Sequence, residues 1–347
     1  MKSVTIAVDV AKSVFEVAVS HRPGRVAENH RLSRDRMMPF FTQKETATVV
    51  FEACGTAHYW GRQLQSLGHR VVLLPPHAVR PYVTRNKTDR SDAKGILEAF
   101  RNQDIFPVPV KSPAQQQLTA LHRLRSAWLA TRTARINTVR ALLREFGVVI
   151  PRGAHHVVPR AWAALGEADS GLPDVLRSAL AEVLLDIRES EEHAHRIELA
   201  LAALAAQVPL VARLRTIPGV GPLTSTALVG FVGEVGRFRS ARHFASYLGL
   251  TPRERSSGTA RHLGAISKRG NTYLRMLLVH GARSVLCRTH RSAPRGRLRT
   301  WAATIEARRG HNKATVALAN KLARIAYAVW KHDAPFKEDH FTAISAT

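Results

Sequence analysis

The sequence predicts an α/β domain at the N-terminus, then a helical coiled-coil middle part and a mainly α-helical C-terminal domain. Three observations support this fold class. Runs of β-branched and apolar residues recur over the first 110 residues. Three prolines within residues 107–113 indicate a linker, and long stretches with apolar residues at helical spacing follow it. With 347 residues, 45% of them hydrophobic, the chain is long enough for two cores and a connecting element.

The first hundred residues have the pattern of a β-hairpin followed by alternating strands and helices. Residues 3–9 and 13–19 are two β-branched runs joined by a short connection, which predicts the hairpin. The other expected elements are strands at 47–52 and 70–74 and helices at 55–67 and 89–101. This order of elements is typical of an RNase H-like domain, assigned here to residues 1–110.

Four acidic residues of this domain stand where metal ligands are expected. Asp9 and Glu52 each end a predicted strand, whereas Asp89 and Asp92 lie three residues apart on one side of a predicted helix. Carboxylates brought together repel one another unless a cation lies between them. The sequence therefore predicts a Mg²⁺ site with four carboxylate ligands, as used in two-metal phosphoryl transfer.

The charge of the chain predicts a polyanionic partner. The 52 Lys and Arg against 26 Asp and Glu give a formal net charge of +26. Nucleic acid fits better than a membrane, because apolar runs end well before the roughly 18 residues that a span needs. Lys87 and Arg90 are expected phosphate contacts beside the aspartates. We also expect a cytoplasmic protein with histidines mainly at the surface, because the 2 Cys and 17 His show no zinc-binding spacing.

Two long helices are expected in the middle region, 111–208. Apolar residues recur at helical spacing from Leu118 to Phe146, and the opposite face is basic, with Glu145 as its acid. Arg123, Arg132 and Arg135 of this face are candidate nucleic-acid contacts. A heptad pattern over 180–204 predicts coiled-coil pairing, either between the two helices of one chain or between subunits. The stretch 147–173 is expected to be irregular.

The third region, 209–335, carries two signals for nucleic-acid binding. Residues 217–228 match a helix-hairpin-helix, in which Gly219 and Gly221 would permit a tight turn whose amides hold a phosphate. Residues 237–275 hold nine Lys or Arg and Glu254 alone, which predicts a phosphate-contacting surface. An amphipathic helix at 313–330 should close the core, and 336–347 is a tail.

Two sets of motifs together resemble one family. The N-terminal set is the acidic quartet with Glu52-Ala53-Cys54-Gly55-Thr56 and Asn86-Lys87-Thr88-Asp89 around it. The C-terminal set includes Ile217-Pro218-Gly219-Val220-Gly221, Gly249-Leu250-Thr251-Pro252-Arg253, Ser257-Gly258 and Lys268-Arg269-Gly270-Asn271. In this order, over nearly the whole chain, they resemble the insertion-sequence-110 family of transposases, which are relatives of the Piv invertases.

The resemblance implies a DNA recombinase with a RuvC-like metal-dependent domain and a C-terminal domain that carries a nucleophilic serine. The serine maps to Ser257, with Ser256 beside it as the alternative. The expected phosphate contacts around it are Arg253, Arg255, Arg261, Lys268 and Arg269. The heptads over 180–204, and the need for more than one active site in recombination of two duplexes, predict a homo-oligomer, dimeric or tetrameric on nucleic acid. The resemblance further implies a structured noncoding guide RNA beside donor and target DNA. No sequence-reading motif contradicts guidance by RNA.

Two other functions fit part of the sequence. A RuvC-like Holliday-junction nuclease would use the four acids, but it would not need the serine segment. A non-enzymatic basic nucleic-acid-binding protein would explain the charge, but it would leave the four acids unexplained.

Overall fold

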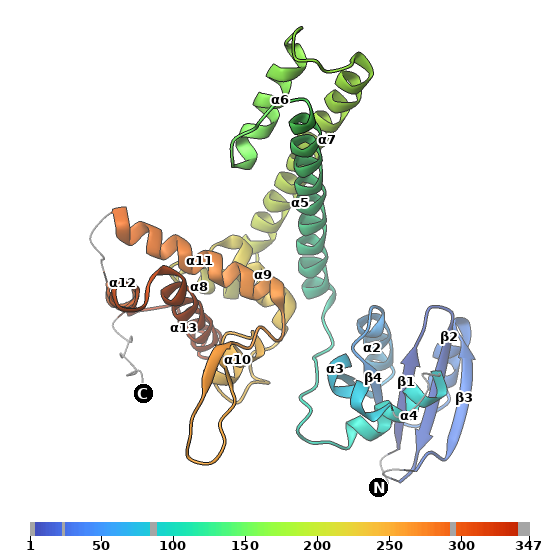
Figure 1. The fold of residues 1–347 in the computed structure, drawn as a ribbon. Helices are drawn as coiled ribbons and strands as arrows, with labels where there is room; N and C mark the ends of the chain where they lie inside the picture. The colour runs from blue at the N-terminus through green and yellow to red at the C-terminus, as the bar shows by residue number, and fades with distance from the viewer. Residues whose placement is uncertain (1–3, 23–24, 84–88, 292–295, 339–347) are drawn as a thin grey trace. The chain divides into compact units, whose positions relative to one another are not determined.

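The computed structural model describes residues 4–22, 25–83, 89–291 and 296–338. The chain divides into two compact units, residues 1–114 and 115–347, which are drawn together in Figure 1. Each unit has cores of its own, and each is described here by itself.

A five-stranded sheet forms the centre of the first unit, with the order β3-β2-β1-β4-β5. The first three strands are antiparallel, and β4 and β5 join β1 in parallel. The strands are β1 Thr5–Val10, β2 Val14–Ser20, β3 Glu28–Ser33, β4 Thr48–Glu52 and β5 Arg70–Leu74. The predicted hairpin and the strands at 47–52 and 70–74 are confirmed. β3 was not predicted, because it is a polar edge strand in which Leu32 alone is buried.

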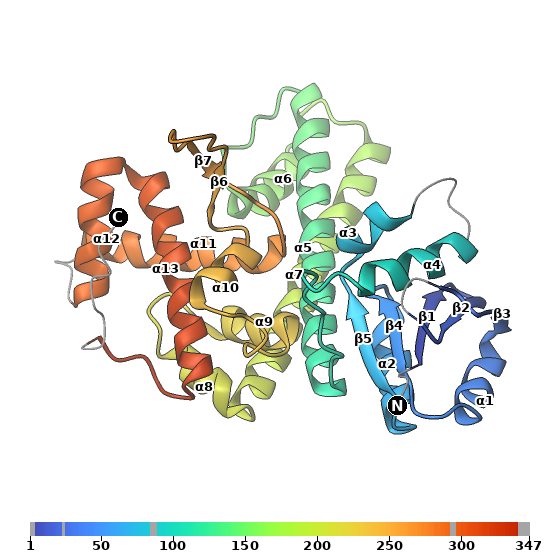
Figure 2. The same ribbon diagram turned by 90° about the horizontal axis from the view of Figure 1, so that it is seen from below.

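Helices cover both faces of this sheet, as the view in Figure 2 shows. One face packs against α1 Met37–Thr42 and α2 Ala57–Ser66. The other packs against α3 Pro76–Val79 and α4 Asp89–Phe100. The predicted helices at 55–67 and 89–101 are thus confirmed within two residues at each end, whereas α1 and α3 were not predicted. Short 3₁₀ turns at Arg34–Arg36 and Arg80–Tyr82 complete the connections.

The proline-rich segment after α4 is fastened to the first unit. The Val108 amide donates to the Leu73 carbonyl of β5 over 2.8 Å, which adds a bridge beside this edge strand. The backbone of Lys111 is held by α2, whose His58 Nδ1 accepts from its amide over 3.2 Å and whose Arg62 donates to its carbonyl over 2.9 Å. A segment expected to be a linker is therefore bound along β5 and α2.

Two long helices begin the second unit, α5 Pro113–Glu145 and α7 Asp174–Ala206. They lie side by side and run antiparallel, because Arg125 pairs with Glu198 and Arg135 pairs with Asp186. Leu180, Ile187 and other heptad positions of α7 are buried within the chain, so the heptads pack intramolecularly here. The 147–173 stretch is not irregular as predicted, because it contains a 3₁₀ turn, Ala154–His156, and α6 Val157–Gly166, whose apolar face packs on both long helices.

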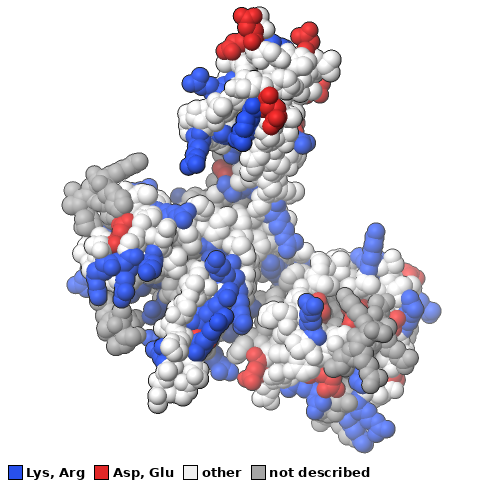
Figure 3. Space-filling view, viewed as in Figure 1, with Lys and Arg blue, Asp and Glu red and all other residues white. Residues whose placement is uncertain are grey.

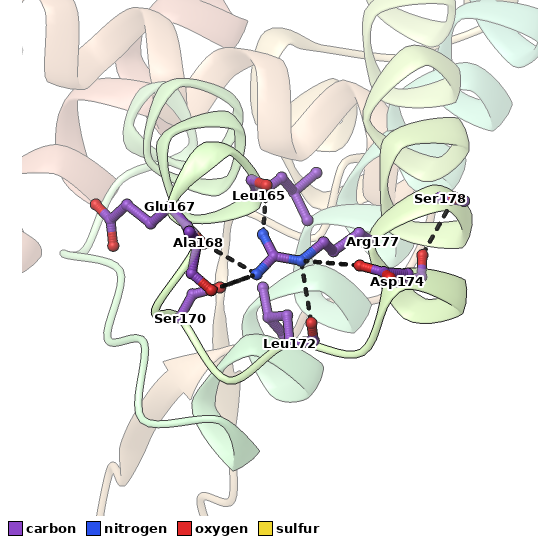
Figure 4. A network of polar contacts seen from close by, with 8 residues as sticks. All are labelled: Leu165, Glu167, Ala168, Ser170, Leu172, Asp174, Arg177 and Ser178. Atoms are coloured by element: carbon purple, nitrogen blue, oxygen red, sulfur yellow. Dashed lines mark hydrogen bonds and ion pairs between the residues drawn. The ribbon is translucent and has the colours of Figure 1, made fainter.

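Arg177 organises the connection from α6 to α7, as Figure 4 shows. Its guanidinium donates to the carbonyl oxygens of Leu165, Glu167, Ala168 and Leu172 and to the Ser170 hydroxyl. Arg140 of α5 similarly donates to the carbonyl oxygens of Ile150, Pro151 and Gly153. Each arginine thus supplies several donors to the backbone carbonyls of one loop.

The rest of the second unit is a helical domain around one large core. Its helices are α8 Pro209–Arg215, α9 Pro222–Val232, α10 Ala241–Tyr247, α11 Thr272–Arg291, α12 Arg297–Arg309 and α13 His311–Lys331. A two-stranded hairpin, β6 Pro252–Glu254 and β7 Leu263–Ile266, extends from it. The predicted helix at 313–330 is confirmed as α13, and most of the predicted tail lies outside the described residues.

No single helix in the described part of the chain is long and apolar enough to cross a membrane. The pair α7 and α8 meets the length and composition criteria only together, with a bend of 106° between them.

Candidate active site

Asp9 and Glu52 occupy equivalent positions on two neighbouring parallel strands, β1 and β4. In the register of β1 and β4, Val8 lies opposite Phe51, and the next residue of each strand is one of the two acids. The carboxyl ends of both strands therefore bring these carboxylates to the same edge of the sheet. This pairing was expected from the sequence, and the structure confirms it.

Both acids lie on the face of the sheet that α4 covers. Side chains alternate along a strand, so Asp9 shares the face of Ala7, and Glu52 shares that of Val50. Ala7 and Val50 are buried in the core that α4 completes. Asp9 and Glu52 themselves are half-buried at its margin.

Asp92 borders the same core from the helix. It lies in the first turn of α4 and immediately precedes Ala93, which packs against the sheet. Its side chain is half-buried, and its Oδ1 atom is shielded from solvent. Asp89 is the first residue of the helix, but its side chain lies outside the described part of the structure.

The described side chains fit the chemistry of a magnesium site but do not form a complete one. Carboxylate oxygens are the donors that Mg²⁺ prefers, and a shielded carboxylate oxygen favours a bound cation. Among the side chains that the structure describes, no three Asp, Glu, His or Cys are placed to hold one metal ion. Lys87 and the side chain of Arg90 also lie outside the described residues.

Ser257 lies in the turn of the β6–β7 hairpin, residues 252–266, which we call the serine hairpin. The Ser257 and Ala260 backbones exchange two hydrogen bonds of 3.2 Å, which closes a turn through Gly258 and Thr259. Gly258 has a φ of 57°, which a glycine adopts without strain. The turn therefore presents Ser257 at an exposed tip.

The Ser256 hydroxyl makes two hydrogen bonds within this hairpin. It donates to Glu254 Oε1 over 2.8 Å and accepts from the His262 amide over 3.3 Å. The same carboxylate oxygen accepts from Arg261 Nε over 3.3 Å. Among the described residues, no side-chain hydrogen bond involves Ser257, so its hydroxyl differs from that of Ser256.

The predicted phosphate contacts of this region surround the serine hairpin and are exposed. Arg253 and Arg255 lie on or beside β6, and Arg261 precedes β7. Lys268 and Arg269 lie in the segment that returns to α11, where Lys268 has a positive φ of 55°. On the face of the second unit seen in Figure 3, Lys and Arg gather around this part of the domain and acids are few. The phosphate contacts stay a prediction.

Arg275 is an exception within the basic stretch. The sequence placed it on the phosphate-contacting surface, but it is 9% exposed. It donates from Nη1 to the carbonyls of Leu248 and Arg269, at 3.0 Å each. This arginine therefore holds the two ends of the serine hairpin together rather than facing a ligand.

The basic face of α5 has acidic partners that its own sequence did not reveal. Glu145 was the one opposing acid expected, but α7 supplies carboxylates to Arg132 and Arg135, each with an Nε–O distance of 2.5 Å. Arg123 is exposed. Nucleic-acid binding by these three arginines stays a prediction, and for two of them it would compete with the pairing between the helices.

Gly219 is required for packing between helices. It has a φ of 82°, and a Cβ at this position would lie 2.6 Å from the Gly281 carbonyl oxygen of α11. Gly221 is exposed at the N-cap of α9, where a Cβ would meet nothing within 4 Å. The turn thus has a structural role in seating α9 on α11, and phosphate binding by its amides stays a prediction.

His122 is a buried residue that the sequence analysis missed, because it assigned the histidines to the surface. It is fully buried between α5, α9 and α11. Its Nδ1 lies 3.0 Å from the Tyr273 hydroxyl, and its Nε2 lies 3.0 Å from Thr226 Oγ1. Burial, and secondarily the charge of Arg125, lowers the pKa of His122 to about 4. The signal available in the sequence was its helical spacing from the apolar Leu118.

Two family models match the chain, and both describe transposases. One, described as a transposase with the DEDD motif of the IS110 group, matches residues 6–148. The other, described as the transposase IS116/IS110/IS902 family, matches residues 211–297. Together they include both the acidic residues and the serine hairpin.

Curated relatives cover nearly the whole chain. A probable family 20 transposase of Pseudomonas aeruginosa is 38% identical over 96% of this chain and 98% of its own. The transposase for insertion sequence element IS1111A of Coxiella burnetii is 36% identical over 95% of this chain and 90% of its own. The transposase for insertion sequence element IS1328 of Yersinia enterocolitica is 36% identical over 95% of this chain and 97% of its own.

Proposed function

The chain belongs to the IS116/IS110/IS902 family of transposases, and we propose that it cleaves and rejoins the DNA of an insertion sequence with the N-terminal acids and Ser257. In this proposal residues 1–110 form a RuvC-like catalytic domain, 111–208 a coiled-coil region and 209–335 the domain that carries the serine. The observation that carries it is the register of β1 and β4, which brings Asp9 and Glu52 to one edge of the sheet.

The acids are proposed to hold divalent metal, with Mg²⁺ as the natural ion. Asp9, Glu52, Asp89 and Asp92 are the residues that would bind it. When bound, such an ion stabilises the negative charge that develops on a phosphodiester during displacement. A cation bound there would also stabilise carboxylates that the two strands bring to the same edge of the sheet.

Ser257 is proposed to be the nucleophile. Its Oγ would form a bond to phosphorus as one P–O bond of the DNA breaks, and the leaving oxygen would take up a proton. The phosphoserine link keeps the energy of the broken bond for rejoining. Arg253 and Arg255, exposed on the same hairpin, would neutralise the phosphate during this step.

DNA is the substrate, and a structured guide RNA and a second subunit are proposed partners. The described part of the chain presents its Lys and Arg on several elements, and its sequence contains no recognisable DNA-reading motif. A protein of this kind grips phosphate backbones, and base pairing with an RNA would select the sites. Two duplexes must be cut and exchanged, which requires more than one copy of each active centre.

The test is a protein–DNA adduct assay on the DNA ends of the element, with the RNA transcribed from its flanks. The wild-type protein and Ser256→Ala should form a covalent adduct, although Ser256→Ala should form less because the hairpin loses two hydrogen bonds. Ser257→Ala should form none. An adduct that persists in Ser257→Ala and disappears in Ser256→Ala would assign the nucleophile to Ser256. Cleavage without any adduct would favour a junction nuclease.

A further inference from the structure

The connections that leave β1 and β4 meet at the carboxyl end of the first sheet. They span residues 11–13 and 53–56. Cys54 Sγ lies 4.0 Å from the Val10 carbonyl oxygen, so the two connections are in contact. In α/β sheets, ligands bind beyond the carboxyl ends of the parallel strands. The same end carries the two strand acids of the candidate active site.

Trp60 is the centre of an aromatic and cationic group beside this end of the sheet. It lies in the first turn of α2, the helix that follows the connection from β4, and it is 4% exposed. The Tyr59 ring makes a T-shaped contact with the Trp60 ring, with 5.1 Å between the ring centres. The Arg34 guanidinium lies 5.2 Å from the centre of the Trp60 ring. Direct contacts thus join three side chains from two elements.

Arg34 connects this group to the turn after β1. Its Nη1 donates to the Lys12 carbonyl over 3.4 Å. A guanidinium has five N–H donors, and in the described part of the chain no carboxylate is paired with Arg34. Both Arg34 and Lys12 are exposed. A cation that a ring and a carbonyl keep in place, with further donors facing solvent, suits a phosphate oxygen.

Tyr59 has the ring of this group that is open to a ligand. It is 45% exposed. Its support is rigid, because Phe15 of the core also packs against Trp60, with 5.2 Å between the ring centres. Among the described residues, no side-chain hydrogen bond involves the Tyr59 hydroxyl. An exposed aromatic ring with fixed neighbours is a platform for a nucleobase, since every base has a π face.

We propose that Tyr59 and Arg34 hold an unpaired nucleotide of the DNA strand that approaches Asp9 and Glu52. The Tyr59 ring stacks on the base, and Arg34 donates to the adjoining phosphate. An unpaired base offers its faces for stacking, whereas the neighbouring base pairs cover them in a duplex. This inference rests on the proposed function, because it takes the N-terminal acids as the place where DNA is cut.

Photo-cross-linking tests the contact at the tyrosine directly. The full-length protein is irradiated with single-stranded DNA that contains iodouracil, which couples to an aromatic ring stacked on it, and mass spectrometry identifies the peptide. We expect a cross-link at Tyr59 in wild type and at the same position in Tyr59→Phe. Tyr59→Leu keeps an apolar contact with Trp60 but has no ring, so this cross-link should be lost. Thermal unfolding of each protein is recorded alongside.

Affinity for a short single strand gives a second measurement. Tyr59→Leu should bind single-stranded DNA at least about 5-fold more weakly, and its affinity for duplex DNA should not change. Arg34→Gln should reduce the slope of log K against log salt by about 0.7 on the single strand. Arg36→Gln is the matched control, because it removes an exposed charge from the same 3₁₀ turn, and its slope should equal that of wild type. Single-stranded RNA of the same sequence is measured in parallel.

Three results would overturn the site. The first is wild-type affinity of Tyr59→Leu for single-stranded DNA, or cross-links that never include Tyr59. The second is equal weakening on duplex DNA, since stacking on an unpaired base would then not be the contact. The third is a loss confined to RNA, which would assign the surface to RNA instead of the DNA strand.

Failure of the site and failure of the proposed function give different results. A covalent adduct at Ser257 together with wild-type affinity of Tyr59→Leu refutes the stacking site and leaves the recombinase intact. The expected cross-link and loss of affinity, without any adduct in the wild-type protein, support the stacking site and refute the serine mechanism.

Discussion

The Tyr273 hydroxyl of α11 donates to His122 Nδ1 of α5 over 3.0 Å, in the interior of the second unit. The direction of this hydrogen bond follows from the partner of the other ring nitrogen, Nε2. Thr226 Oγ1 donates to the Pro222 carbonyl over 2.6 Å, so it must accept from His122 Nε2–H. His122 is therefore neutral with its proton on Nε2, and one chain of hydrogen bonds joins three helices.

This neutral histidine predicts a loss of stability in mild acid. The folded-state pKa of about 4 lies below the ordinary value of 6.5, so the unfolded chain takes up a proton that the folded chain does not. The stabilisation is complete above pH 6.5 and is lost as the pH falls towards 4, with about 2 kcal/mol lost by pH 5. Urea unfolding at pH 7.5 and pH 5 measures it. His122→Gln should lose about 2 kcal/mol less over this interval, and equal losses would contradict the assignment.

Replacing Asp92 with Asn should remove magnesium binding without unfolding the protein. Asp92 Oδ1 is shielded from solvent, so a neutral side chain of the same shape is tolerated while a charged ligand is lost. Mg²⁺ should raise the unfolding temperature of wild type and not that of Asp92→Asn, and recombination should fall at least about 100-fold. Asp104→Asn, an exposed acid of the same unit, should behave as wild type in both measurements. Equal responses to Mg²⁺ in all three proteins would argue against a metal site.

Gly281→Ala should destabilise the second unit even though alanine favours helices. A Cβ at Gly281 would lie 2.1 Å from the Gly219 carbonyl oxygen, so α11 and the turn before α9 would have to separate. We expect a loss of about 2 kcal/mol or more in the free energy of unfolding. Gly166→Ala is the control, since a Cβ there meets nothing within 4 Å in α6. A Gly281→Ala protein as stable as wild type would show that the close approach is unimportant.

Arg177→Met should loosen the connection between α6 and α7 and leave the rest of the unit folded. The carbonyls of residues 165–172 lose their shared donor, while the methionine keeps the aliphatic part of the side chain. Hydrogen exchange should become faster in this segment and in α6. Arg188→Met, at an exposed position of the same helix, should leave exchange unchanged. Faster exchange throughout the second unit would mean that Arg177 supports its global stability instead.

The elements that the sequence predicted are those with strong periodicity. β1, β2, β4 and β5 are apolar runs, and α13 has a clear apolar face, so local pattern and tertiary burial agree. β3 has one buried residue, and the helical part of 147–173 is short, so neither produced a readable signal. The placement of Asp9 and Glu52 at one edge could be predicted from where their strands end, because neighbouring parallel strands end at the same edge of a sheet.

Roles that depend on distant partners could not be predicted. Arg135 meets Asp186, 51 residues away, and Arg275 meets the Leu248 carbonyl, 27 residues away. The local charge pattern placed both arginines on the surface, because it contains no information on which distant residues pack against them. His122 was misassigned for the same reason, because its two partners are 151 and 104 residues distant.

The proline-rich segment that pairs with β5 has a consequence for how this protein behaves in solution. β5 ends the sheet, and a bare edge strand offers a template on which another chain can add and aggregation can begin. On that edge the Leu73 carbonyl already accepts a hydrogen bond from the Val108 amide. Its neighbours Pro107 and Pro109 have no N–H to donate. This segment therefore offers no regular row of backbone donors with which a further chain could pair. The segment that leads out of the first unit thereby also protects the sheet from intermolecular pairing.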